Sequence, residues 1–189
     1  MIKDEPPELK IIYKGLFDFD VLYKAMRQYL QAEGFQPATY PEDGIALYDT
    51  AWLSYYLEKG DPTRYVIRWN TKMDLGKYWR YLIDITINTV SVTRVEVPYE
   101  GKKEKMFSGE IEIILKSTVL GDYKDEWSKH WLLKHFQHKY EKRMMKKDLD
   151  VHEENILFYM NQLAGVIRSY LKQTTEQIPG NIAEKIRSD

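Results

Sequence analysis

The chain has 189 residues, which is long enough for one domain with its own hydrophobic core. Its 28 lysines and arginines and 29 aspartates and glutamates leave a net charge of −1, so bulk charge favours neither nucleic acid nor a membrane surface as a partner. The absence of cysteine excludes disulfides, thiolate chemistry and cysteine-ligated metals. The polar N-terminal segment is unlike a signal peptide, and no apolar run approaches the roughly 20 residues of a membrane span, so we expect neither feature.

The N-terminal part of the chain predicts an extended arm followed by a strand. Residues 1–8 are mostly polar and contain two prolines, whereas the short apolar run Leu9–Lys14 is typical of an edge strand. Gly15 is predicted to turn the chain after that strand. We therefore expect an N-terminal arm at 1–8, a single domain at 9–175 and a C-terminal arm at 176–189.

A first helix is predicted over 18–33. Asp18 or Asp20 is its expected N-cap, because a carboxylate at that position accepts hydrogen bonds from the free backbone N–H groups of the first turn. Gly34 is the expected stop signal. The residues that share one apolar helical face are Leu22, Ala25, Met26, Tyr29 and Leu30.

Residues 44–59 combine a strand-like alternation with aromatic side chains on the opposite face, Trp52 and Tyr56. A strand buried on both faces has this pattern, and so does a strand at an interface. The chain contains 15 tyrosines and 5 tryptophans, and such residues serve both cores and interfaces. The strands predicted after residue 59 carry polar residues on one face, and exposure of that face to solvent is the favoured interpretation over an interaction surface. The candidate protein-interaction surface consists of Trp52, Tyr55, Tyr56, Arg68 and Arg80.

Residues 64–120 carry the clearest pattern in the chain and predict three successive strands. Short connections between them favour an antiparallel meander. After Ile87 the apolar parity changes twice, which predicts bulges or a sharp bend near Thr89 and Thr93. The residues predicted to face the core are Tyr65, Ile67, Trp69, Thr71, Met73, Trp79, Tyr81, Ile83, Ile85, Ile87, Ile111, Ile113 and Leu115.

Two long helices are predicted towards the C-terminus, at 124–147 and 151–175, from apolar stripes at spacings of three and four. Asp148–Asp150 is predicted to separate them, with Asp150 and Glu153 forming a capping box. Helices that are kept apart from an antiparallel sheet define the α+β class. We predict an antiparallel sheet of about four to five strands, covered on one face by the N-terminal helix and the two long C-terminal helices.

The stretch 129–147 is strongly basic, with seven lysines and arginines against one glutamate. Cations neutralise phosphates and aromatic rings stack on bases, so nucleic acid is one candidate partner, after an acidic protein. The interpretation that we favour over both is a solvated outer helix face. The candidate basic patch consists of Lys134, Lys139, Lys142, Arg143 and Lys146.

The chain carries no recognisable catalytic signature. His135 and His138 are one helical turn apart, but a metal site needs further ligands of fitting geometry, so surface histidines are the favoured interpretation. The segment His152–Asn155 lacks the second histidine of a zinc-protease helix. Phosphate-loop, dinucleotide and nucleophile-elbow patterns are absent. We therefore expect a non-enzymatic protein with no catalytic residue, no cofactor and no metal.

The segments Ile12–Gly15, Phe17–Asp20 and Leu22–Tyr23 form a motif near the start of the chain, and Gly109–Ile113, the region of Trp127 and the predicted closing helices follow it. Together they resemble an uncharacterised protein family of tailed phages and archaeal or metagenomic genomes. The family brings no catalytic residues. It implies a structural subunit of a virion, such as a tail, neck or baseplate component, found in the virion or the host cytoplasm. Its partners would be other subunits of the assembly or copies of itself.

Two alternatives stay open. The predicted element order is similar to that of helix-grip folds, in which a curved sheet wraps around a long C-terminal helix and encloses an apolar cavity. Those folds usually have more strands before the helix than the sequence predicts here. This similarity implies a carrier of a small apolar ligand. The other alternative is a nucleic-acid or ribosome-associated factor that acts through 129–147.

Overall fold

The structure is a computed structural model that describes residues 2–38, 55–59, 64–99, 102–124, 126–131 and 145–176. This part of the chain forms seven strands and three helices. The strands are β1 (Ile2–Asp4), β2 (Leu9–Phe17), β3 (Gln36–Pro37), β4 (Tyr55–Lys59), β5 (Arg64–Leu75), β6 (Trp79–Tyr99) and β7 (Lys102–Gly121). The helices are α1 (Phe19–Ala32), α2 (Glu126–Lys129) and α4 (Met145–Glu176).

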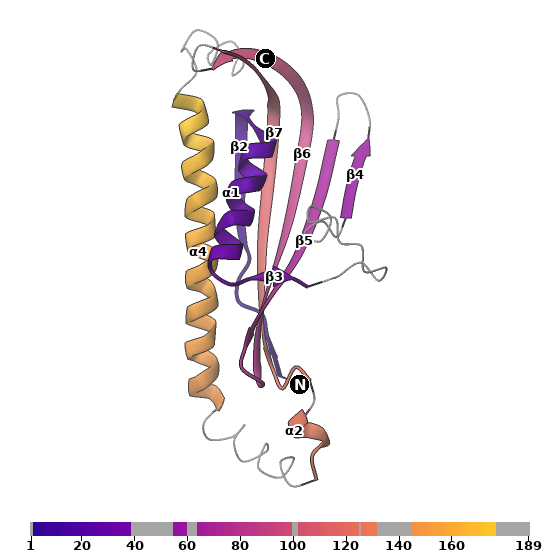
Figure 1. The fold of residues 1–189 in the computed structure, drawn as a ribbon, viewed down its shortest axis with the longest axis vertical. Helices are drawn as coiled ribbons and strands as arrows, with labels where there is room; N and C mark the ends of the chain where they lie inside the picture. Colours follow the sequence, from indigo (N-terminus) through magenta and orange to yellow (C-terminus); the bar gives the residue numbers. More distant parts are fainter. Residues whose placement is uncertain are drawn as a thin grey trace.

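All seven strands belong to one antiparallel sheet with the order β1-β7-β6-β5-β3. Strand β2 also pairs with β7, and β4 also pairs with β5, so β1 and β2 share one edge of the sheet while β3 and β4 share the other (Figure 1). The predicted α+β class and the meander of three central strands are confirmed. Short segments such as β1 and β3 add strands beyond the number predicted.

Helices α1 and α4 cover the same face of the sheet (Figure 1). The core-facing alternation predicted for the central strands is confirmed, because Trp69, Tyr81, Ile83 and Ile113 are fully buried. Each such apolar side chain contributes about 1.5–3 kcal/mol when it is removed from water. The buried residues from the helices are Leu22, Met26 and Leu30 of α1, and Ile156, Met160, Leu163, Ala164, Ile167 and Leu171 of α4.

Helix α1 begins and ends as predicted. The Asp18 side chain accepts hydrogen bonds from the backbone N–H groups of Asp20 and Val21, at 2.9 and 3.2 Å. Gly34 follows the helix with a φ of +89°, a conformation that glycine adopts at little cost. The prediction that Gly15 turns the chain is wrong. Strand β2 continues through Gly15, which pairs with Gly109, because the ladder with β7 extends to Phe17.

The predicted irregularity in the second central strand is confirmed. The register between β6 and β7 shifts between Val90 and Thr93, and Ser91 has a φ of +52°. Figure 1 shows β6 and β7 bending towards the helices at this end of the sheet. The shift places one extra residue on β6 and so changes the faces of that strand alone, and Val92 is therefore buried where strict alternation from Ile87 would expose it.

The C-terminal helix begins earlier than predicted. Helix α4 runs unbroken from Met145 to Glu176, so the separation at Asp148–Asp150 and the capping box at Asp150 and Glu153 are wrong. Acidic side chains in the first turns favour a helix, because they interact well with its free N–H groups. The prediction of a separate helix at 124–147 falls largely on residues outside those described. None of the helices in the described part of the chain is long and apolar enough to cross a membrane.

Candidate functional site

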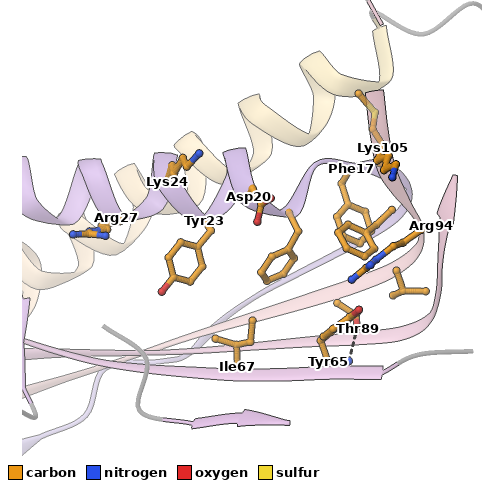
Figure 2. A pocket seen from close by; sticks show the side chains of 14 residues that line it. Phe17, Asp20, Tyr23, Lys24, Arg27, Tyr65, Ile67, Thr89, Arg94 and Lys105 are labelled. Atoms are coloured by element: carbon orange, nitrogen blue, oxygen red, sulfur yellow. Dashed lines mark hydrogen bonds between the residues drawn. The ribbon is translucent and has the colours of Figure 1, made fainter. Parts of the chain in front are cut away.

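A partly open pocket of about 740 Å³ lies between helix α1 and strands β5, β6 and β7 (Figure 2). Its wall on the helix side is formed by residues such as Phe19 and Tyr23, and its floor by the inward residues of the strands. The lining residues are Phe17, Phe19, Asp20, Tyr23, Lys24, Arg27, Tyr65, Ile67, Thr89, Val92, Arg94, Lys105, Met106 and Phe107.

The end wall of the pocket is a cluster of aromatic rings around Phe107. Strand register explains it, because Phe107 pairs with Phe17 of β2, and their rings stack with centroids 6.1 Å apart. Phe19 and Tyr65 meet the Phe107 ring edge-on at 6.3 and 5.8 Å. Rings in these arrangements attract one another beyond the area that they bury. The wall is therefore apolar, which suits the body of an apolar ligand.

The other end of the pocket is tied to the core through Tyr23. The Tyr23 ring stands edge-on to the fully buried Trp69, with 4.4 Å between centroids. On the floor, the buried Thr89 hydroxyl accepts a hydrogen bond from the Tyr65 backbone N–H at 2.9 Å (Figure 2). This bond joins the start of β5 to β6 beside the register shift.

The charged residues around the pocket are mostly positive. Four cations line it, Lys24, Arg27, Arg94 and Lys105, against one carboxylate, Asp20. Arg94 lies over the aromatic wall, with its guanidinium carbon 5.5 Å from the Phe107 ring centroid. Within the described ranges of the chain, no carboxylate forms an ion pair with Arg94.

The residues of the predicted protein-interaction surface do not all come together. Trp52 lies outside the described residues, while Tyr55 and Tyr56 belong to β4, where Tyr55 pairs with Arg68. Arg68 is exposed on the sheet face opposite the helices. Arg80 of β6 pairs across the sheet with Asp74 of β5. Asp74 lies six residues after Arg68 on the same strand, so Arg68 and Arg80 are roughly 20 Å apart.

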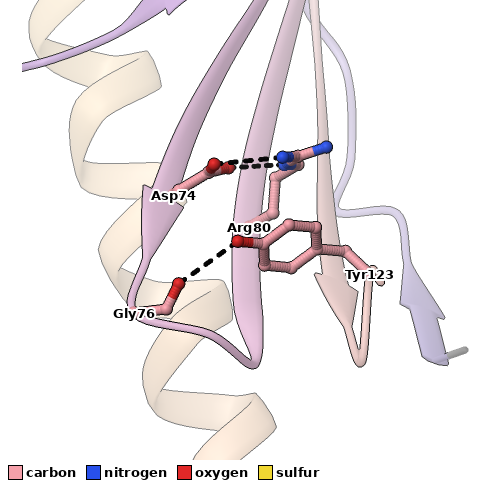
Figure 3. A network of polar contacts seen from close by, with 4 residues as sticks. All are labelled: Asp74, Gly76, Arg80 and Tyr123. Carbon is pink, nitrogen blue, oxygen red and sulfur yellow. Dashed lines mark hydrogen bonds and ion pairs between the residues drawn. The ribbon is translucent and has the colours of Figure 1, made fainter. Parts of the chain in front are cut away.

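Arg80 takes part in a contact within the chain (Figure 3). Its guanidinium bonds the Asp74 carboxylate through Nε at 2.5 Å and through a terminal nitrogen at 3.0 Å, and lies 4.0 Å from the centroid of the Tyr123 ring. Tyr123 in turn donates to the Gly76 carbonyl at 3.3 Å. The hydrogen bond from Arg80 lowers the pKa of Asp74. This network joins the β5–β6 turn to the end of β7, which gives Arg80 a structural role.

The predicted basic patch falls mainly on residues outside those described. This holds for Lys134, Lys139, Lys142 and Arg143, as it does for the histidine pair at 135 and 138. Lys146 belongs to the first turn of α4. Among the residues that the structure does describe, no group of three or more histidine, aspartate or glutamate side chains is placed to hold a metal ion.

His152 of α4 is half-buried at the edge of the hydrophobic core. Its Nδ1 lies 2.7 Å from the Tyr81 hydroxyl, and its ring centroid is 4.4 Å from that of Trp79. Burial lowers the pKa of His152, and the weaker attraction of the Asp148 carboxylate opposes this effect. The likeness of the His152 segment to a metal-binding helix is superficial. In the structure His152 packs against Trp79 and Tyr81.

A depressed histidine pKa predicts how stability depends on pH. As the pH falls below about 6.5, the unfolded chain binds a proton before folded His152 does, so the free energy of unfolding decreases until the folded pKa is passed. His152→Gln is expected to reduce this loss between pH 7.5 and 5.5, measured by urea unfolding. His130→Gln, at an exposed histidine, serves as the control. Identical pH dependence in His152→Gln and the unmodified protein would contradict the assignment.

Comparison with known proteins adds no family. No protein-family model matches the chain, and searches of curated proteins and of solved structures also found no match. The resemblance to the phage family stays a prediction. The class that the structure defines is an α+β protein with two helices packed on one face of an antiparallel sheet.

The pocket residues were not predicted as a site. Phe17, Arg94 and Phe107 are far apart in the chain, and only the pairing register brings them together. The one signal in the sequence was the change of apolar parity after Ile87, because it marks the bend that closes this end of the sheet.

Proposed function

We propose that the protein binds a small, largely apolar molecule in the pocket under α1 and acts as a carrier or sensor of that molecule, not as an enzyme. The observation that carries the proposal is the pocket itself. Its volume of about 740 Å³ lies within the range of roughly 300–1,000 Å³ that small-molecule sites occupy. Its end wall is aromatic, as is usual for such sites, and five charged side chains also line it.

The pocket lies in a different place from the cavity expected for a helix-grip arrangement. The inward residues of α4, such as Met160, Leu163 and Ile167, are fully buried in the core. The hollow lies instead beside α1, at the end where β6 and β7 bend. The small-ligand proposal therefore rests on this pocket, with α1 as the helix that covers the ligand, and not on the helix-grip arrangement predicted around the C-terminal helix.

A pair of substitutions on neighbouring residues of β5 tests the proposal. Ile67 lines the pocket, whereas Val66 points to the opposite face of the same strand. We expect the neutral fluorescent probe N-phenyl-1-naphthylamine to bind at one site per chain. Ile67→Trp fills the pocket and is expected to weaken this binding at least about tenfold, which corresponds to roughly 1.4 kcal/mol. Val66→Trp is expected to leave it unchanged.

The measurement is a fluorescence titration, with circular dichroism to confirm that both variants are folded. No saturable binding to the unmodified protein would refute the proposal. Equal binding by Ile67→Trp and Val66→Trp would show that the probe sits elsewhere.

A second candidate is a structural subunit of a larger assembly, such as a virion tail, neck or baseplate component. It is favoured by exposed apolar side chains on α4, where Val151 and Phe158 are seven residues apart and so share one face. Trp131 is also 73% exposed. Light scattering at low and high salt separates the candidates, since a ring or larger oligomer supports an assembly subunit. A monomer that binds the probe supports the carrier.

A further inference from the structure

We infer that the ligand of this pocket is an amphipathic anion, whose apolar body lies against the aromatic wall and whose negatively charged head group binds Arg94. This inference deepens the proposed function and rests on it. Medium-chain fatty acids and aromatic carboxylates belong to this chemical class.

Strand register places Arg94 beside the aromatic wall. Phe17 of β2, Phe107 of β7 and Arg94 of β6 are direct neighbours across the sheet, so the three side chains form one row on the face that lines the pocket. Figure 2 shows the Arg94 guanidinium reaching from its strand into the space enclosed by the lining residues. A molecule stacked on the wall would thus have its end next to a cation.

The position of Arg94 is a consequence of the bulge. Without the register shift between Val90 and Thr93, alternation along β6 would put even-numbered residues such as Arg94 on the outer face, as it does for Arg80 and Asp84. The shift turns Val92 and Arg94 towards the pocket. The irregular stretch of β6 therefore supplies the pocket with a charge that a regular strand would have directed away from it.

The surroundings of Arg94 favour an anion over a neutral or cationic ligand. Lys105 lies on the same face, two residues from Phe107, and is a diagonal neighbour of Arg94 at roughly 7–8 Å. Asp20 is the single carboxylate among the lining residues, and within the described ranges it forms no ion pair with Arg94. A guanidinium presents two parallel N–H groups that match a carboxylate. A ligand carboxylate would complete that pairing, and a ligand cation would be repelled.

Decanoate and decanol provide a matched test, because they share an alkyl chain and differ in the head group. Each is titrated at pH 7 against the protein with N-phenyl-1-naphthylamine already bound, and displacement gives its affinity. We expect decanoate to bind the unmodified protein about tenfold or more tightly than decanol. Raising the salt concentration is expected to reduce that ratio, because ions screen a partly exposed charge pair.

Substitutions at Arg94 test the residue. Arg94→Gln is expected to weaken decanoate at least about tenfold more than it weakens decanol or the probe, and Arg94→Lys is expected to restore part of that difference. Arg68→Gln, an exposed arginine on the opposite face of the sheet, is the matched control and is expected to change neither ligand.

The outcomes separate this inference from the proposed function. If the probe binds but decanoate and decanol displace it equally, the anion inference is overturned while the ligand-binding function stands. If Arg94→Gln leaves the preference for decanoate intact, Arg94 is not the head-group site and the inference fails in that form. If the probe does not bind at all, both proposals fail together.

Discussion

Replacing Trp69 by alanine is expected to lower the free energy of unfolding by about 3–5 kcal/mol, the usual cost of truncating a large buried aromatic residue. Trp69 is fully buried in the middle of β5, and Tyr23 of α1 stands edge-on to its ring at 4.4 Å. Alanine would remove this contact and leave a void between the sheet and α1. Urea unfolding monitored by circular dichroism measures the change.

Two comparison variants sharpen the Trp69 prediction. Trp131→Ala removes the same side chain at a site where it is 73% exposed, and a change within about 0.5 kcal/mol is expected. Trp69→Phe keeps an aromatic ring against Tyr23 and is expected to cost less than alanine. A loss below about 1 kcal/mol for Trp69→Ala would mean that Trp69 does not anchor α1 on the sheet.

Introducing a charge under α4 should destabilise the protein at least as strongly. Leu163 is fully buried where α4 meets the core, so a carboxylate at this position would have no water and no partner. We expect Leu163→Asp to lower the free energy of unfolding by about 4 kcal/mol or more at pH 7. Gln162→Asp introduces the same charge one residue earlier, at an exposed position, and is expected to change stability little.

The pH dependence of Leu163→Asp is a second measurement. Burial raises the pKa of a carboxyl group, so the introduced side chain should be neutral in the folded state at acidic pH. The difference in stability between Leu163→Asp and Gln162→Asp is therefore expected to shrink as the pH falls from 7 towards 4. A difference that stays constant would indicate that α4 had moved to expose the carboxylate to water.

Local patterns predicted the elements whose partners are close in the chain. Asp18 and Gly34 marked both ends of α1 because capping depends only on adjacent backbone groups. The parity change after Ile87 located the bulge for a similar reason, because the alternation of apolar and polar residues within one strand shows where its faces switch. Gly15 misled the prediction because its role depends on β7, with which it pairs, and not on its neighbours.

The candidate site depended on information that one strand does not carry. Phe17 and Phe107 meet only in a particular register, and the sequence pattern does not show how far β2 slides along β7. The start of α4 was misplaced for a different reason. Aspartates such as Asp148 and Asp150 are favoured both as the N-cap of a new helix and in the first turns of a helix that has already begun. The local sequence therefore did not distinguish the two arrangements, and the structure has the second.

The pairing of β2 with β7 also sets an order of events during synthesis. Leu9 pairs with Leu115, which lies 115 − 9 = 106 positions later in the chain. At a ribosomal rate of about 5–20 residues per second, β2 waits roughly 5–20 s before its neighbour has been made. During that time its inward side chain Ile11 has no sheet to pack on, whereas the hairpins of β5, β6 and β7 form from adjacent segments. Strand β2 is thus made early and placed late, and during this interval its apolar side chains are exposed to aggregation or to capture by a chaperone.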